Sequence, residues 1–118
     1  MKRKLSLYVK DMLEACIKIQ QFLEGINYED FIKDDKTSSA VIRKIEIIGE
    51  AVKCLPPDIR QTFSDISWSA IAKMRDKVIH FYHEIDYEII WETATSDIPA
   101  LIPKLEKVYL YLLDLEKS

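Results

Sequence analysis

Residues 5–24 read LSLYVKDMLEACIKIQQFLE. Their apolar side chains recur at steps of three and four residues, which is the spacing of one face of an α-helix. These apolar residues are Leu5, Tyr8, Val9, Met12, Leu13, Cys16, Ile19, Phe22 and Leu23. Gly25 follows and suits the position just after a helix C-terminus. The segment therefore predicts a long amphipathic helix whose apolar face needs other helices to cover it.

The same periodicity predicts a second helix that ends at Pro56-Pro57. Thr37, Ser38 and Ser39 are its candidate N-caps. Its apolar stripe consists of Val41, Ile45, Ile48, Val52 and Leu55. Before it, residues 27–36 read as an acidic connector with a short apolar anchor at Phe31-Ile32. Gly49 lies inside the helix, where glycine costs about 1 kcal/mol relative to alanine, so we expect another helix to approach closely there.

Helical patterns continue to the end of the chain. Residues 58–63 suit one short helical turn, and Asp65 or Ser67 can cap a third helix that runs through Tyr82. Asp86 can cap a fourth helix, from Tyr87 to about Ser96. Because proline disrupts a helix interior, Pro99 and Pro103 predict a bend or break near Ser96-Asp97. A fifth helix follows, with the stripe Leu101, Leu105, Val108, Leu112 and Leu115.

The composition agrees with these patterns. The 118 residues include only two glycines and four prolines, too few for the many turns of a β-sandwich or barrel. We therefore predict one domain over residues 1–118, an all-α up-and-down bundle of four to five helices. The two cysteines, Cys16 and Cys54, cannot form a disulfide framework and are expected to be small buried thiols.

Charge and hydropathy limit the classes of function. The net charge of −3 disfavours a large contact with nucleic acid phosphates, so a nucleic-acid role must depend on a local site. No signal peptide is evident at the N-terminus, and no apolar run reaches the roughly 20 residues of a membrane span. The sequence predicts a soluble, cytoplasmic protein without a membrane segment.

Arg75 is the charged residue in the most unexpected place. On an ideal helix with Ile71 at zero, Val78 lies at about −20°, Tyr82 at about +20° and Arg75 at about +40°. Arg75 thus falls within the apolar arc, where a guanidinium needs a carboxylate or another polar partner. His80 lies at about 180°, so a site that uses both residues requires a distorted helix or a second protomer.

Two interpretations of these residues remain open. In the structural one, Arg75 reaches the surface or pairs with Glu46 or Glu50, and His80 is a solvated surface residue. In the functional one, Arg75 holds a phosphate and His80 transfers a proton near neutral pH. His80 and His83 could also ligate a metal, but two histidines without further convergent ligands make a poor site.

Four sequence blocks resemble the HepT-like proteins of the HEPN superfamily (higher eukaryotes and prokaryotes nucleotide-binding). Arg75-x4-His80-x-Tyr82 matches the Arg-x4-His-x-Tyr motif of that family. The segments at 45–51 (IEIIGEA), 66–76 (ISWSAIAKMRD) and 86–91 (DYEIIW) resemble its second-helix signature and the stretches before and after the motif. Together they extend over nearly the whole chain.

This resemblance implies a helical ribonuclease toxin that needs no metal or other cofactor. Such proteins form homodimers in which the two motifs line a shared cleft, and they pair with a minimal nucleotidyltransferase antitoxin, as in type II or type VII toxin–antitoxin systems. Arg75 and His80 would then be catalytic, with Asp76 at the polar position after the arginine, where many relatives carry asparagine. Tyr82 would be the residue to which the antitoxin transfers AMP.

The implied reaction is attack of an RNA 2′-hydroxyl on the adjacent phosphate, with His80 as general acid or base and Arg75 stabilising the developing charge. An alternative is a non-catalytic helical subunit that binds substrate or nucleotide for a separate nucleotidyltransferase. A third possibility is a structural dimer with a degenerate site. Toxicity on expression, with and without Arg75→Ala, separates the first two.

Overall fold

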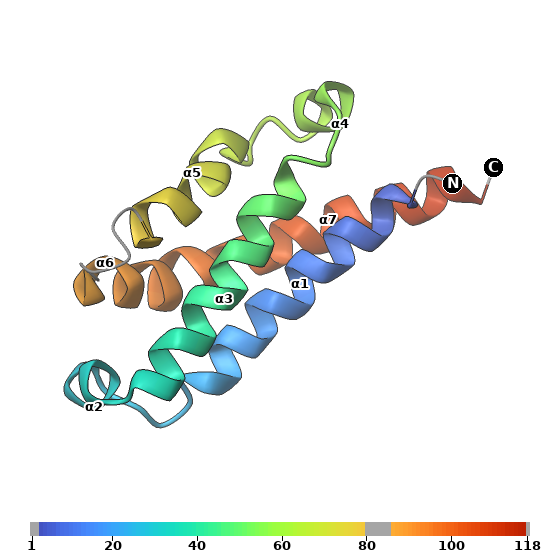
Figure 1. The fold of residues 1–118 in the computed structure, drawn as a ribbon. Helices are drawn as coiled ribbons and strands as arrows, with labels where there is room; N and C mark the ends of the chain where they lie inside the picture. The colour runs from blue at the N-terminus through green and yellow to red at the C-terminus, as the bar shows by residue number, and fades with distance from the viewer. Residues whose placement is uncertain (1–2, 80–85, 118) are drawn as a thin grey trace.

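The computed structural model describes residues 3–79 and 86–117, and this part of the chain contains helices and no β-strand (Figure 1). The α-helices are α1 (Leu5–Phe22), α2 (Tyr28–Lys33), α3 (Asp35–Val52), α4 (Pro57–Thr62), α5 (Trp68–Ile79), α6 (Tyr87–Glu92) and α7 (Ile98–Glu116). The all-α prediction is confirmed. The five predicted helices correspond to α1, α3, α5, α6 and α7, the predicted turn at 58–63 corresponds to α4, and α2 is additional.

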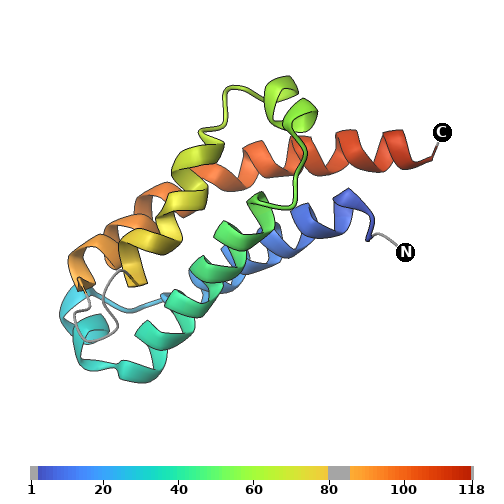
Figure 2. The ribbon, with the colours of Figure 1, turned by 45° about the horizontal axis from the view of Figure 1, so that its top comes forward.

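The long helices form an elongated bundle of 49 × 29 × 28 Å. Helix α1 packs against both α3 and α7, and α5 packs on α3 (Figure 1). Both ends of the chain lie at the same end of the bundle, as Figure 2 shows. There the Ser6 hydroxyl and backbone N–H donate to the two carboxylate oxygens of Glu116, at 2.5 and 3.0 Å. These two bonds tie the start of α1 to the last turn of α7.

The predicted apolar stripes form the core. In α3, the stripe from Val41 to Leu55 is buried throughout. In α7, the stripe is buried up to Leu112, but Leu115 is 50% exposed. In the described part of the chain, no helix is both long and apolar enough to cross a membrane.

The two cysteines differ. Cys16 is buried in α1, and burial raises the pKa of its thiol to about 12. The prediction that Cys54 is also buried is wrong, because its side chain is exposed. Cys54 lies beyond the end of α3 at Val52, and its neighbour Leu55, the last residue of the apolar stripe, occupies the buried position.

The connector before α3 is more ordered than predicted. Residues 28–33 form α2, whose first turn is capped by the Asn27 side chain, which accepts from the Asp30 N–H at 2.8 Å. The apolar anchor is confirmed at Phe31, which is fully buried, whereas Ile32 is 39% exposed. The ring of Phe31 packs against the aromatic rings of Tyr87 and Trp91 from α6.

Helix α3 begins earlier than its predicted caps. Asp34 is the N-cap, and its carboxylate accepts from the backbone N–H of Thr37 at 3.1 Å and from its hydroxyl at 2.6 Å. These hydrogen bonds lower the pKa of Asp34. Thr37 and Ser38 therefore lie inside the helix, because the longer reach of Asp34 satisfies its free N–H groups first.

Helix α4 connects α3 to α5. Within it, Arg60 donates from Nη2 to the carbonyl of Val52, the last residue of α3, at 2.8 Å, and that carbonyl also accepts from the Leu55 N–H at 3.0 Å. Trp68, the first residue of α5, donates from Nε1 to the carbonyl of Phe63 at 3.0 Å. Helix α5 starts directly after Ser67, one of its two predicted caps, and is described as far as Ile79. The predicted extension to Tyr82 lies outside the described residues.

At Ser96-Asp97, where the sequence predicts a bend or break, the helical pattern changes without a break: a π-helical segment, Thr93–Asp97, joins α6 to α7 (Figure 1). A wider turn suits this position, because Pro99 in the first turn of α7 cannot donate to a carbonyl one turn earlier. The Thr95 hydroxyl donates to the carbonyl of Trp91 at 2.7 Å. Pro103 lies inside α7. Asp86 caps α6 as predicted and accepts from the Ile89 N–H at 3.1 Å.

Candidate active site

Helices α3 and α5 come unusually close at Gly49. A Cβ atom placed on Gly49 would lie 3.1 Å from the Cβ of Arg75 and 3.5 Å from the carbonyl oxygen of Ala72. Any side chain larger than hydrogen would press on α5. The close approach expected at Gly49 is therefore confirmed, and the neighbour that it accommodates is the stem of Arg75.

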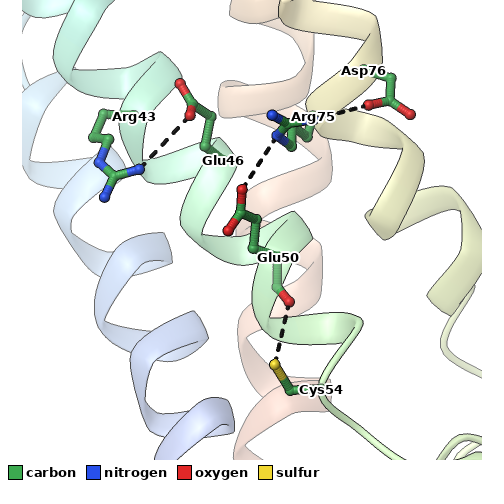
Figure 3. Close-up of polar contacts among 6 residues, drawn as sticks. All are labelled: Arg43, Glu46, Glu50, Cys54, Arg75 and Asp76. Atoms are coloured by element: carbon green, nitrogen blue, oxygen red, sulfur yellow. Dashed lines mark hydrogen bonds and ion pairs between the residues drawn. The ribbon is translucent and has the colours of Figure 1, made fainter.

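Two carboxylates flank the Arg75 guanidinium (Figure 3). Its Nε lies 3.6 Å from Oε1 of Glu50 on α3, and its Nη1 lies 3.4 Å from Oδ1 of Asp76 on α5. The side chain of Arg75 is 32% exposed, whereas those of Glu50 and Asp76 are 61% and 62% exposed. The site is thus a half-buried cation between two solvated acids.

The structure also decides which acid on α3 pairs with Arg75. The sequence left Glu46 and Glu50 as alternatives, and Glu50 is the partner. Glu46 lies one turn earlier and pairs with Arg43 on its own helix, at 3.7 Å (Figure 3). The direction of each side chain is visible in the close-up, where Glu46 turns to Arg43 and Glu50 to Arg75.

The Nε atom of Arg75 is buried and makes no hydrogen bond within residues 3–79 and 86–117, although Glu50 is close. Both contacts of the guanidinium with acids exceed 3.3 Å, so neither is a short, charge-assisted hydrogen bond. A guanidinium presents its donors in a planar fork that matches the oxygens of a phosphate. Arg75 therefore retains capacity for an oxyanion ligand, which is the chemistry expected of a phosphate-binding arginine.

Of the predicted site residues, the structure brings Arg75 and Asp76 together. His80 and Tyr82 belong to residues 80–85, which lie outside the described residues, as does His83. Glu50 entered the sequence analysis only as a structural partner of Arg75. The signal that singles it out is its position directly after Gly49, since the closest contact of α3 with α5 brings the adjacent residue within reach of Arg75.

Comparison with known proteins gives the site a context. A model of the family described as Ribonuclease HepT-like matches residues 12–108. The chain belongs to the HepT-like ribonuclease family. A protein of Thermococcus cleftensis named probable ribonuclease HepT is 45% identical over 108 residues, which cover 92% of this chain and 98% of that protein.

Two further relatives are named as candidate RNases. One, from Caldanaerobacter subterraneus, is 44% identical over 101 residues, covering 86% of this chain and 90% of the relative. The other, from Methanocaldococcus jannaschii, is 40% identical over 117 residues, covering 99% of this chain and 98% of the relative. No solved structure matches. The family suggested by the four sequence blocks is therefore confirmed.

Proposed function

We propose that this HepT-like chain is a metal-independent endoribonuclease toxin whose active site contains Arg75, Asp76 and His80. The observation that carries the proposal is the family match together with near full-length relatives named as ribonucleases. The geometry supports it, because a half-buried guanidinium with unused donor capacity suits a phosphate ligand.

In the proposed reaction, the RNA 2′-oxygen attacks the adjacent phosphorus and loses its proton, and the bond from phosphorus to the 5′-oxygen breaks. The 5′-oxygen leaves with a proton, which gives a 2′,3′-cyclic phosphate and a 5′-hydroxyl. His80 moves one of these protons as general base or acid, a contribution of typically about 10²–10⁴-fold. Arg75 stabilises the charge that develops on the phosphate oxygens.

Asp76 occupies the position after the arginine, with its carboxylate 3.4 Å from the Arg75 Nη1. In the proposed site it orients the outer edge of the guanidinium by a charge-assisted contact. Its negative charge also lowers the attraction of the site for RNA. Replacement by asparagine would keep the acceptor oxygen and remove that charge, so this variant measures which of the two effects is larger.

A homodimer completes the proposed site. The chain has a net charge of −3, so its RNA contact must be small and local. Lys73 and Lys77 are exposed on α5 on either side of Arg75 in the sequence. A two-fold interface would supply this set of cations twice in one cleft. A monomeric mass by light scattering at micromolar concentration would count against the shared cleft.

A minimal nucleotidyltransferase is the proposed antitoxin, and Tyr82 is the proposed acceptor of AMP. An adenylyl phosphate near Arg75 would compete with RNA for the guanidinium, and its bulk would block the cleft. Tyr82→Phe removes the acceptor oxygen and should escape neutralisation after co-expression with the partner. If intact-mass analysis shows AMP on Tyr82→Phe as well, the modified residue is another one.

Cleavage of a single-stranded RNA by purified protein tests the ribonuclease proposal. We expect cleavage to persist in EDTA and to be lost in Arg75→Ala and His80→Ala, with unchanged helical circular dichroism. Activity that disappears with EDTA and returns with a divalent ion would contradict the metal-free mechanism. The non-catalytic alternative predicts a different outcome. The folded wild-type chain would cleave no RNA, and a co-purified nucleotidyltransferase would be active only in the presence of this chain.

A further inference from the structure

We propose that Glu50 is the positioning residue of Arg75: it holds the Nε side of the guanidinium and so directs the outer Nη edge toward the RNA phosphate. This inference rests on the proposed ribonuclease function. Glu50 itself touches no substrate in this proposal and acts only through Arg75.

The first support is the position of the two acids around the guanidinium. Glu50 approaches Nε from α3, whereas Asp76 approaches Nη1 from the same helix as Arg75. A bidentate contact with phosphate through both Nη groups leaves the Nε donor free for a protein carboxylate. Glu50 is the acid in the right place, because its Oε1 lies 3.6 Å from Nε.

The second support is the unsatisfied donor. The Nε of Arg75 is buried, and no atom of the described part of the chain accepts a hydrogen bond from it. A buried donor without a partner destabilises the folded chain. The nearby Glu50 carboxylate can approach by a few tenths of an ångström through rotation of an exposed, flexible side chain. This contact, present without RNA, holds the Nε side of the guanidinium before substrate arrives.

The third support is the backbone geometry at Gly49. Because Gly49 lets α3 and α5 approach, the carboxylate of the next residue reaches Arg75 from a rigid helix rather than from a loop. Glu46 provides the matched comparison: it lies on the same helix, one turn earlier, and carries the same carboxylate, yet pairs with Arg43. Net charge is therefore equal in variants of the two glutamates, and only the contact with Arg75 differs.

Four proteins test the proposal: wild type, Glu50→Gln, Glu50→Ala and Glu46→Ala, each checked for folding by circular dichroism and thermal melting. We expect Glu50→Ala to lower kcat for RNA cleavage about 10–100-fold, since small misplacements of a catalytic group have effects of this order. Glu50→Gln keeps an acceptor oxygen for Nε and should stay within about threefold of wild type. Glu46→Ala should stay within about twofold, because screened surface charges contribute little.

Two kinetic results would overturn the positioning role. The first is a wild-type kcat in Glu50→Ala. The second is a kcat in Glu50→Gln as low as that in Glu50→Ala, because the charge or proton of Glu50 would then matter and its acceptor oxygen would not. If Glu50→Ala does not fold, Glu50→Asp replaces it, because its carboxylate is one methylene shorter and should lose the contact while keeping the charge.

A second readout needs no RNA. In ¹⁵N-labelled protein, the Nε–H signal of Arg75, assigned by its loss in Arg75→Lys, should exchange slowly with water in wild type and Glu50→Gln and faster in Glu50→Ala. Equal exchange in all three would contradict contact between Glu50 and Arg75. A wild-type chain that cleaves no RNA overturns the proposed function, and the NMR comparison then decides separately whether Glu50 holds Arg75.

Discussion

Helix α3 has two sides with opposite character. One side carries Ile45, Ile48 and Val52, each fully buried. The other side, at Gly49 and Glu50, meets α5 through a close backbone approach and a loose ion pair with Arg75. Both sides belong to the same 18-residue helix, so differences between them arise from side chains and not from the backbone.

The contrast shows where stability and chemistry come from. Buried apolar side chains contribute most to folding, whereas half-exposed ion pairs contribute about 0–1 kcal/mol. The pair of Arg75 with Glu50 is thus too weak to explain an arginine within an apolar arc. Under the proposed function, the placement of Arg75 meets the demand for positive charge beside an RNA phosphate.

The largest effect on stability is expected on the apolar side. Ile48→Ala removes a fully buried side chain and should lower the free energy of unfolding by about 2–5 kcal/mol, the range for cavity-forming substitutions. Urea denaturation measures this loss. The RNA cleavage rate per folded molecule should stay near the wild-type rate. A large fall in that rate in a folded Ile48→Ala protein would show that the buried side of α3 also determines activity.

A smaller loss of stability, with a larger loss of function, is expected at Gly49. In Gly49→Val, the added side chain presses on the Cβ of Arg75, where even a single methyl carbon would lie at 3.1 Å. Overpacking of this kind costs about 1–3 kcal/mol. Because α5 must move, cleavage should fall further than the folded fraction does. A folded Gly49→Val protein that cleaves RNA at the wild-type rate would show that the close approach of α3 and α5 is not needed to place Arg75.

The smallest effect is expected at the start of α3, away from both sides. Hydrogen bonds from Thr37 lower the pKa of Asp34 in the folded state below the ordinary value of 3.8. The ionised carboxylate therefore stabilises the fold above pH 3.8, and this contribution is lost as the pH falls through the lowered pKa. Asp34→Ala should melt at a lower temperature than wild type at pH 7, and the difference should shrink in acid. A difference that grows in acid would contradict the assignment.

Much of the fold could be predicted from the spacing of apolar residues. The stripes of α1 and α3 are long and regular, and they determine which faces are buried. Shorter elements were harder to predict from the sequence. The helix that Asn27 caps is too short to show a periodic pattern, and the π-helical segment before Pro99 has no distinct pattern of its own. Cys54 was misplaced because it stands next to the stripe in the sequence without belonging to it: Leu55 takes the buried position, and neighbouring helical positions lie about 100° apart.

The site was predictable only in part. The position of Arg75 on its helix shows from one element alone that a charge intrudes on an apolar face. Which acid meets it depends on the rotation of α3 against α5, and periodicity does not specify that rotation. Gly49 indicated a close approach, but only the tertiary structure shows that the approaching residue is Arg75 and that Glu50 lies beside it.

Analysis of the RNA ends tests the central claim most directly. A short single-stranded RNA is incubated with wild type, Arg75→Ala and His80→Ala in EDTA, and the products are analysed by mass spectrometry. We predict 2′,3′-cyclic phosphate and 5′-hydroxyl ends with wild type only. Products with 5′-phosphate and 3′-hydroxyl ends, or the same cleavage by folded Arg75→Ala protein, would contradict a mechanism in which Arg75 stabilises attack by the 2′-oxygen.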